Sequence, residues 1–200
     1  MKLNKLCCLC VVAALGGAMI SLPALAHDRV LHSMNALQDG FLHPFTGLDH
    51  LLAMLAIGIW SAQQKHTHAW FIPASFPLMM LAGGALYLLG VVLPGVEHGI
   101  AASVLVLGLL ISFAVKLSVG AGMALVSVFA MAHGYAHGQE MPVSESAMLY
   151  GAGFVLATAL IHAAGWFVSN TAQKMLASKL PRFAGVMITV AGAFFLSSLE

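Results

Sequence analysis

Long apolar runs separated by short polar stretches dominate the pattern of positions along this 200-residue chain. After residue 26 the runs fall at roughly 46–62, 70–91, 98–115, 119–136, 146–168 and 183–198. A helix needs about 17–20 apolar residues to cross the hydrocarbon of a bilayer. No soluble domain or low-complexity tract interrupts the runs. The pattern therefore predicts an all-α protein: a polytopic membrane bundle of six transmembrane helices in a single domain, residues 27–200.

The N-terminus is typical of a secretory signal peptide. Lys2 and Lys5 precede an apolar run that ends at Leu22, and Ala24-Leu25-Ala26 then offers a small-x-small cleavage site. We expect residues 1–26 to be removed, which leaves a short outer N-terminal arm, residues 27–44; an uncleaved first span is the alternative. All three cysteines lie in this segment, so the mature chain would offer no thiolate ligand.

Composition and charge support a membrane protein of defined orientation. The chain is 60% hydrophobic and only 8% charged, with a mean hydropathy of +0.95. A net charge of +1 without a basic patch argues against nucleic acid as a partner. We expect a protein of the bacterial inner membrane, and cleavage would leave its mature N-terminus in the periplasm. Five basic residues then fall in cytoplasmic connections, as the positive-inside rule expects: Lys65, Lys116, Lys174, Lys179 and Arg182.

Two short polar clusters stand out against this apolar background. The first contains His43, Asp49 and His50, and the second contains His133, His137 and Glu140. Imidazole and carboxylate groups together are a ligand set for divalent first-row transition metals. Ionisable groups beside hydrocarbon are costly and usually functional. On the predicted topology both clusters lie at the same outer depth, so we predict one shared metal site.

Other polar residues are secondary candidates for metal binding. Glu97 and His98 open the third span, where the carboxylate also suits the helix dipole. His162 lies well inside the fifth span; it is a candidate for a second station on an ion path, and a buried hydrogen bond is an equal alternative. His27, the expected mature N-terminal residue, can chelate a metal with its amine and imidazole.

At the two clusters the chain resembles the HupE/UreJ family of nickel permeases. The segments that carry the resemblance are His43-Pro44-x-x-Gly47-x-Asp49-His50-x-x-Ala53-Met54 and His133-Gly134-x-Ala136-His137-Gly138-x-Glu140. Ala132 departs from the pattern, since an aromatic residue commonly precedes the first histidine of the second motif. The resemblance implies import of Ni²⁺, with Co²⁺ as an alternative cargo. It also implies possible association with hydrogenase or urease maturation proteins.

Three functions remain open from the sequence. The first is a secondary permease or facilitator that imports a divalent metal, with Ni²⁺ as the first choice. The metal is its substrate and not a bound cofactor. It is not an enzyme on this interpretation, and no phosphate-binding loop is present to couple it to ATP. The alternatives are an intramembrane zinc-dependent hydrolase and a membrane metal sensor that does not transport.

Overall fold

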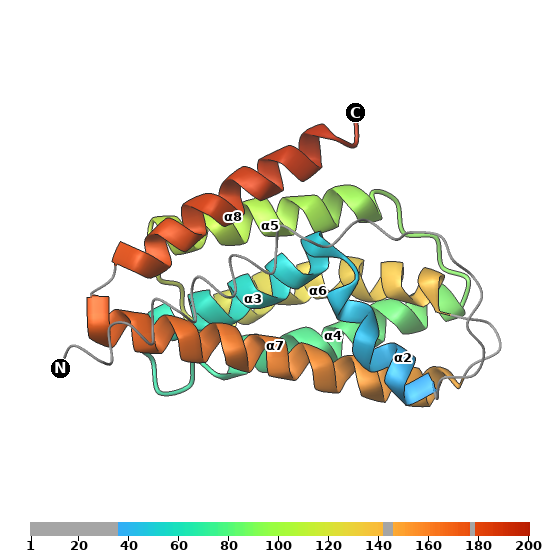
Figure 1. Ribbon diagram of the computed structural model, residues 1–200. Helices are drawn as coiled ribbons and strands as arrows, with labels where there is room; N and C mark the ends of the chain where they lie inside the picture. The colour runs from blue at the N-terminus through green and yellow to red at the C-terminus, as the bar shows by residue number, and fades with distance from the viewer. Residues whose placement is uncertain (1–35, 142–145, 177–178) are drawn as a thin grey trace. The chain divides into compact units, whose positions relative to one another are not determined.

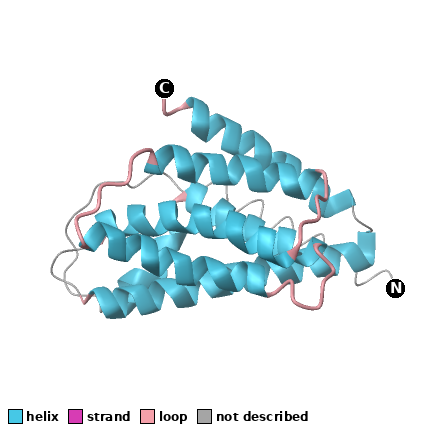
Figure 2. Ribbon diagram, turned by 180° about the vertical axis from the view of Figure 1, so that it is seen from behind, coloured by secondary structure: helices cyan, strands magenta, loops and turns pink. Residues whose placement is uncertain are grey.

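The computed structural model describes residues 36–141, 146–176 and 179–200, and every regular element in this part of the chain is a helix (Figures 1 and 2). The predicted signal peptide and His27 lie outside the described residues. The helices are α2 (Ala36–Leu42), the 3-10 turn η1 (His43–Phe45), α3 (Leu48–Gln63), α4 (Phe71–Leu88), α5 (Val96–Ser112), α6 (Val119–Glu140), α7 (Ala147–Leu176) and α8 (Lys179–Ser197). The all-α prediction is confirmed for these residues, and each predicted apolar run corresponds to one of the helices α3 to α8.

The lengths of the helices support a membrane protein but leave the number of crossings open. The helices α4, α6, α7 and α8 are each long and apolar enough to cross a bilayer. The segments Ala36–Phe45 and Leu48–Gln63 together would make a fifth, although they are bent by 81°. The apolar helix α5 has 17 residues and is shorter than these four helices. Six crossings therefore remain a prediction.

The helices pack in pairs whose backbones approach closely at glycines. The closest pairs are α4 with α6, α5 with α8, α3 with α7 and α2 with α7. In each pair, both helices supply a glycine at which a Cβ atom would collide with the partner's backbone. These glycines are Gly83 and Gly134, Gly108 and Gly192, Gly58 and Gly165, and Gly40 and Gly153. Small residues allow such approaches in lipid, where no hydrophobic effect drives helices together.

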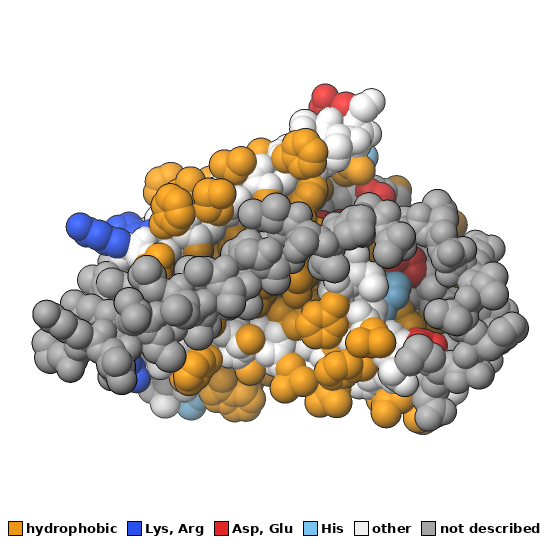
Figure 3. All heavy atoms as spheres, viewed as in Figure 1, with side chains coloured by type: hydrophobic (Ala, Val, Ile, Leu, Met, Phe, Trp, Pro, Cys, Tyr) orange, Lys and Arg blue, Asp and Glu red, His pale blue; other side chains and the backbone are white. Residues whose placement is uncertain are grey.

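Basic and acidic side chains separate to opposite ends of the helices. The turns after α3 and α5 meet at one end, where Gln64 donates to the carbonyl of Val115 and accepts from the amide of Leu117, both at 3.1 Å. Arg182, at the start of α8, donates to the carbonyl of Ser112 at this same end. Figure 3 shows blue side chains where α7 gives way to α8, red ones at the other end, and mostly apolar side chains between them. We call the first the basic end and the second the acidic end.

Candidate metal site

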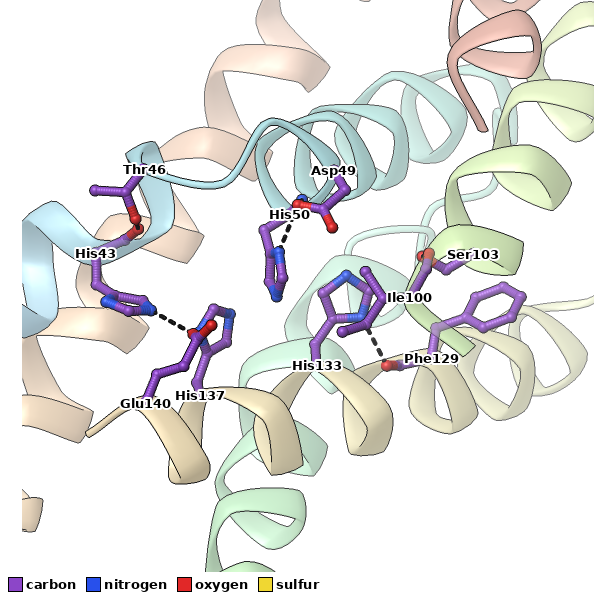
Figure 4. Close-up of polar contacts among 10 residues, drawn as sticks. All are labelled: His43, Thr46, Asp49, His50, Ile100, Ser103, Phe129, His133, His137 and Glu140. Carbon is purple, nitrogen blue, oxygen red and sulfur yellow. Dashed lines mark hydrogen bonds and ion pairs between the residues drawn. The ribbon is translucent and has the colours of Figure 1, made fainter. Parts of the chain in front are cut away.

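A break between η1 and α3 brings two parts of the first cluster to one place. Pro44 lies in the 3-10 turn, and Gly47 precedes α3 in an extended conformation. The turn is held by Thr46, whose hydroxyl donates to the carbonyl of His43 at 2.7 Å. The chain bends by 81° between the two helical segments. His43, before the bend, and His50, after it, therefore both reach the same stretch of α6 (Figure 4).

The second cluster lies on one face of the last two turns of α6. His133 and His137 are four residues apart and Glu140 follows three residues later, so a helix presents them on one stripe. A carboxylate at the C-terminal end of a helix is unfavourable to the helix dipole. Helix stability therefore does not account for Glu140. Asp49, in the first turn of α3, interacts favourably with the helix dipole, so its position at the helix end does not by itself indicate a functional role.

Glu140 joins the two clusters directly. Its Oε2 atom accepts a hydrogen bond from His43 Nε2 at 2.8 Å and lies 3.3 Å from His137 Nδ1. The ring centroids of His43 and His137 are 4.9 Å apart. Ligand atoms of these three residues all lie within 4.8 Å of one another, so the group could hold a metal ion.

Asp49 and a backbone carbonyl fix the orientation of the two more deeply placed imidazoles. Asp49 Oδ1 lies 2.7 Å from His50 Nδ1 and also accepts the backbone amide of His50 at 2.8 Å. The carbonyl of Phe129 lies 2.9 Å from His133 Nδ1. Neither acceptor carries a proton, so each Nδ1 atom donates. A neutral imidazole has only one N–H, and Nε2 is therefore the atom with a free lone pair in both rings. Metal-binding histidines are commonly held by such outer contacts.

The free nitrogens belong to rings that lie next to one another. The Nε2 atoms of His50, His133 and His137 are buried and have no hydrogen-bond partner among the described residues. The ring centroid of His50 lies 4.3 Å from that of His137 and 5.0 Å from that of His133. An unsatisfied buried polar atom costs about 1–3 kcal/mol, so three together favour a place where an ion or water molecules bind.

We call His43, His50, His133, His137 and Glu140 the array. Burial of the side chains increases along the array, which leads inward from a cavity. The side chain of Glu140 is 53% exposed, that of His43 23% and that of His137 7%, and His133 is fully buried. The cavity has a volume of about 220 Å³ and is lined by His43, Thr46, Gly47, Asp49, His50, Glu97, Ala136, His137 and Glu140. It is wide enough for an ion that still carries water.

Of the secondary candidates that the structure describes, only Glu97 lines this cavity. Glu97 lines the cavity, whereas its neighbour His98 is exposed and does not. His162 is buried on α7, away from this cavity, and its ring packs against Phe76.

Sequence reasoning missed two groups that shape the array. The carbonyl of Phe129 orients His133, and its position four residues earlier on the same helix is the signal that could have found it. The ring of Phe154 lies 4.2 Å from that of His137. It comes from α7, and no pattern in the sequence connects it with the clusters.

Comparison with known proteins decides the family. The family model described as HupE / UreJ protein matches residues 14–195. The chain is also 38% identical over 180 residues to Protein HupE of Rhizobium leguminosarum bv. viciae, covering 90% of this chain and 94% of that relative. The chain belongs to the HupE/UreJ family. The resemblance predicted from the two motifs is thus confirmed, and both lie inside the matched region. No solved structure matches the chain significantly.

Proposed function

We propose that this protein is a secondary permease or facilitator for a divalent first-row transition metal, with Ni²⁺ as the first choice and Co²⁺ as the alternative. One observation carries the proposal. A row of imidazoles with unpartnered nitrogen atoms begins at an open cavity and continues into the interior of a bundle of apolar helices. A site that only stored or sensed a metal would not need a series of positions of increasing burial.

Two neighbouring positions along the array would receive the ion. His43, His137 and Glu140 form the entrance position, where an exposed carboxylate and two imidazoles exchange part of the hydration shell for protein ligands. The Nε2 atoms of His50 and His133 form the inner position, and Asp49 orients His50 without binding the ion. His137 lies beside both. The six predicted ligands thus act as one array, in which five ligate and Asp49 positions its neighbour.

The membrane potential is a sufficient driving force for inward movement. A doubly charged ion gains about 4.6 kcal/mol per 100 mV, twice the value for a single charge. We place the acidic end outside and the basic end in the cytoplasm of a bacterial inner membrane, following the positive-inside rule. A cleaved signal peptide at 1–26 and a periplasmic mature N-terminus accord with this orientation. The imported ion would serve metalloenzyme maturation, with hydrogenase and urease maturation proteins as partners, as the family resemblance implies.

The hydrolase alternative fits the array less well. A hydrolytic zinc site keeps an open water position and usually a carboxylate free to accept a proton. Both carboxylates closest to the imidazoles, Asp49 and Glu140, are instead hydrogen-bonded to histidines.

Nickel uptake into proteoliposomes tests the function and the shared site together. His50→Ala and His133→Ala should each nearly abolish uptake, and the double variant should cost little more than either change, because residues of one unit are not additive. His66→Ala is the matched control: this histidine is exposed in the turn between α3 and α4 and should leave uptake unchanged. Absence of uptake by the unaltered protein would refute the permease. Wild-type uptake by the single variants, or losses that multiply, would refute the shared site.

A further inference from the structure

A second cavity lies between the start of α4 and the middle of α7, next to the end of α3. It has a volume of about 320 Å³. Small side chains form much of its lining: Pro73, Ala74 and Pro77 come from α4, and Ala159 and Ala163 come from α7. These residues leave room between two helices that are not among the closely packed pairs.

The lining of this cavity is apolar. Ser61 and His162 are its polar lining residues besides two tryptophans. The hydroxyl of Ser61 already donates to the carbonyl of Ala69 at 3.2 Å, and the Nε2 atom of His162 is buried. An ion or a cluster of water molecules needs several polar partners. The cavity therefore suits hydrocarbon.

The cavity opens on the outer face of the bundle. Ala159, Ala163 and Trp166 are all exposed and are spaced four and three residues apart, so they form one stripe along α7. Trp70, which precedes α4 at the basic end, is 58% exposed. Tryptophan is enriched where the hydrocarbon of a bilayer meets the lipid headgroups. We therefore expect lipid chains of the leaflet at the basic end to reach the cavity.

Two exposed lysines flank the route from the cavity to the basic end. Lys174 follows Trp166 by eight residues, which is about 12 Å along α7. Lys65 lies in the turn between α3 and α4. No Asp or Glu occurs in residues 50–96 or 146–199, so no carboxylate of these segments neutralises the two cations. A phosphate group would complement them.

From this arrangement we infer that the cavity binds one acyl chain of an anionic phospholipid, phosphatidylglycerol, whose phosphate lies near Lys65 and Lys174. Basic residues at the membrane surface attract anionic lipids, by about fivefold for each lysine. The bound chain would fill the space that the small side chains leave between α4 and α7. The inference goes beyond metal transport and requires only that these helices lie in a bilayer.

Native mass spectrometry of the full-length chain tests the headgroup. The protein is released from nanodiscs that contain equal amounts of phosphatidylglycerol and phosphatidylethanolamine with identical chains. We expect one lipid to stay bound, with phosphatidylglycerol preferred. Lys65→Gln and Lys174→Gln should each lower this preference about fivefold. Lys116→Gln is the matched control, because its turn joins α5 and α6, which do not line the cavity; the preference should not change.

The variant Ala163→Leu tests the cavity itself. Ala163 lines the cavity from an exposed position of α7, so a larger side chain should occupy the space that the acyl chain needs. Retention of lipid should then be lost, whichever headgroup the lipid carries. Ala164→Leu is the matched control: the neighbouring alanine is equally exposed but does not line the cavity, and this variant should retain lipid as the unaltered protein does.

The possible results separate the parts of the inference. Lipid retained by Ala163→Leu, or lost equally from both alanine variants, would overturn the cavity as the binding site. Equal retention of the two lipids by the unaltered protein, or an unchanged preference in both lysine variants, would overturn the anionic headgroup. Dimers without bound lipid would mean that a second copy of the chain covers the cavity instead. None of these results depends on nickel uptake, so the permease is tested separately.

Discussion

The region where α3 meets α6 and the pair formed by α5 and α8 differ in how the hydrogen bonds of their polar side chains are satisfied. In the second pair the hydroxyl side chains are satisfied within their own helices: for example, Ser112 donates to Gly108 at 2.8 Å and Thr189 donates to Gly185 at 2.9 Å. Among the described residues, buried side-chain polar atoms without a partner lie on α3, α6 and α7, and none lies on α5 or α8. The polar groups of the pair α5 and α8 are thus satisfied within the protein, whereas the imidazole region has buried nitrogen atoms that are free to accept a ligand.

Close glycine packing, by contrast, is common to both regions, and disrupting it has the largest expected effect. Gly134, between the histidines of α6, would place a Cβ atom against the backbone of Met80, and Gly108 of α5 would place one against Thr189. Gly134→Leu and Gly108→Leu should each lower the free energy of unfolding by about 3 kcal/mol, the upper end of the cost of overpacking. Reversible unfolding in mixed detergent micelles measures this.

Gly120→Leu is the control for both variants, because a Cβ atom there meets no other atom within 4 Å. Its effect should stay within about 1 kcal/mol. A cost at Gly108 but none at Gly134 would show that the histidine region is not tightly packed.

The sequence was sufficient for the helices but not for their bends and partners. Each apolar run predicted a helix because burial in lipid forces the backbone to bond within itself. The two motifs identified the imidazoles and carboxylates, and the i, i+4 spacing placed His133 and His137 on one face. The 81° bend after η1 was not predicted. Residues 36–42, expected in an outer arm, form a helix packed on α7.

The roles of individual residues also could be assigned only from the three-dimensional structure. Gly134 belongs to the second motif, and the structure gives it a packing contact with α4. The ring of Phe76 contacts those of His133 and His162, and these contacts depend on which helices become neighbours. Sequence spacing does not carry that information. By contrast, the bond between neighbouring Asp49 and His50 is local, and the motif contains both partners.

The orienting bond to His50 provides the next largest effect. Asp49→Asn replaces the carboxylate that holds His50 Nδ1 with a weaker, uncharged acceptor. We expect the affinity for Ni²⁺ to fall about 10–100-fold, as is usual when an outer contact of a metal ligand is removed. Isothermal titration calorimetry measures it.

Ser112→Ala is the matched control for this change. It removes a hydrogen bond of similar length from the pair α5 and α8, and the affinity should not change. Equal affinities for Asp49→Asn and the unaltered protein would show that orientation of His50 does not matter for binding.

In the absence of metal the two regions should respond to apolar substitution with opposite signs. His133→Leu removes the buried unpaired Nε2, which stabilises by about 1–3 kcal/mol, and also the bond from Nδ1 to Phe129, which costs about 1 kcal/mol. The free energy of unfolding of the metal-free protein should therefore rise by about 1 kcal/mol. Thr189→Val removes a satisfied hydrogen bond and should lower the free energy of unfolding by up to about 1 kcal/mol. The same detergent unfolding assay serves for both. A loss of stability in metal-free His133→Leu would contradict the conclusion that the imidazole region has buried nitrogen atoms that are free to accept a ligand.

The smallest effect concerns two neighbouring residues at the start of α5, the helix that belongs to both regions. Glu97 lines the cavity at the entrance of the array and His98 does not. A carboxylate at the mouth of a cavity raises the local concentration of cations, and this effect weakens with salt. Glu97→Gln should therefore lower the rate of nickel uptake by roughly two- to fivefold at low ionic strength and by less at high ionic strength. His98→Ala should leave it unchanged at both. Uptake rates at subsaturating Ni²⁺ provide the measurement. If Glu97→Gln instead abolishes uptake regardless of salt, Glu97 is a ligand of the entrance position, and α5 belongs with the imidazole region.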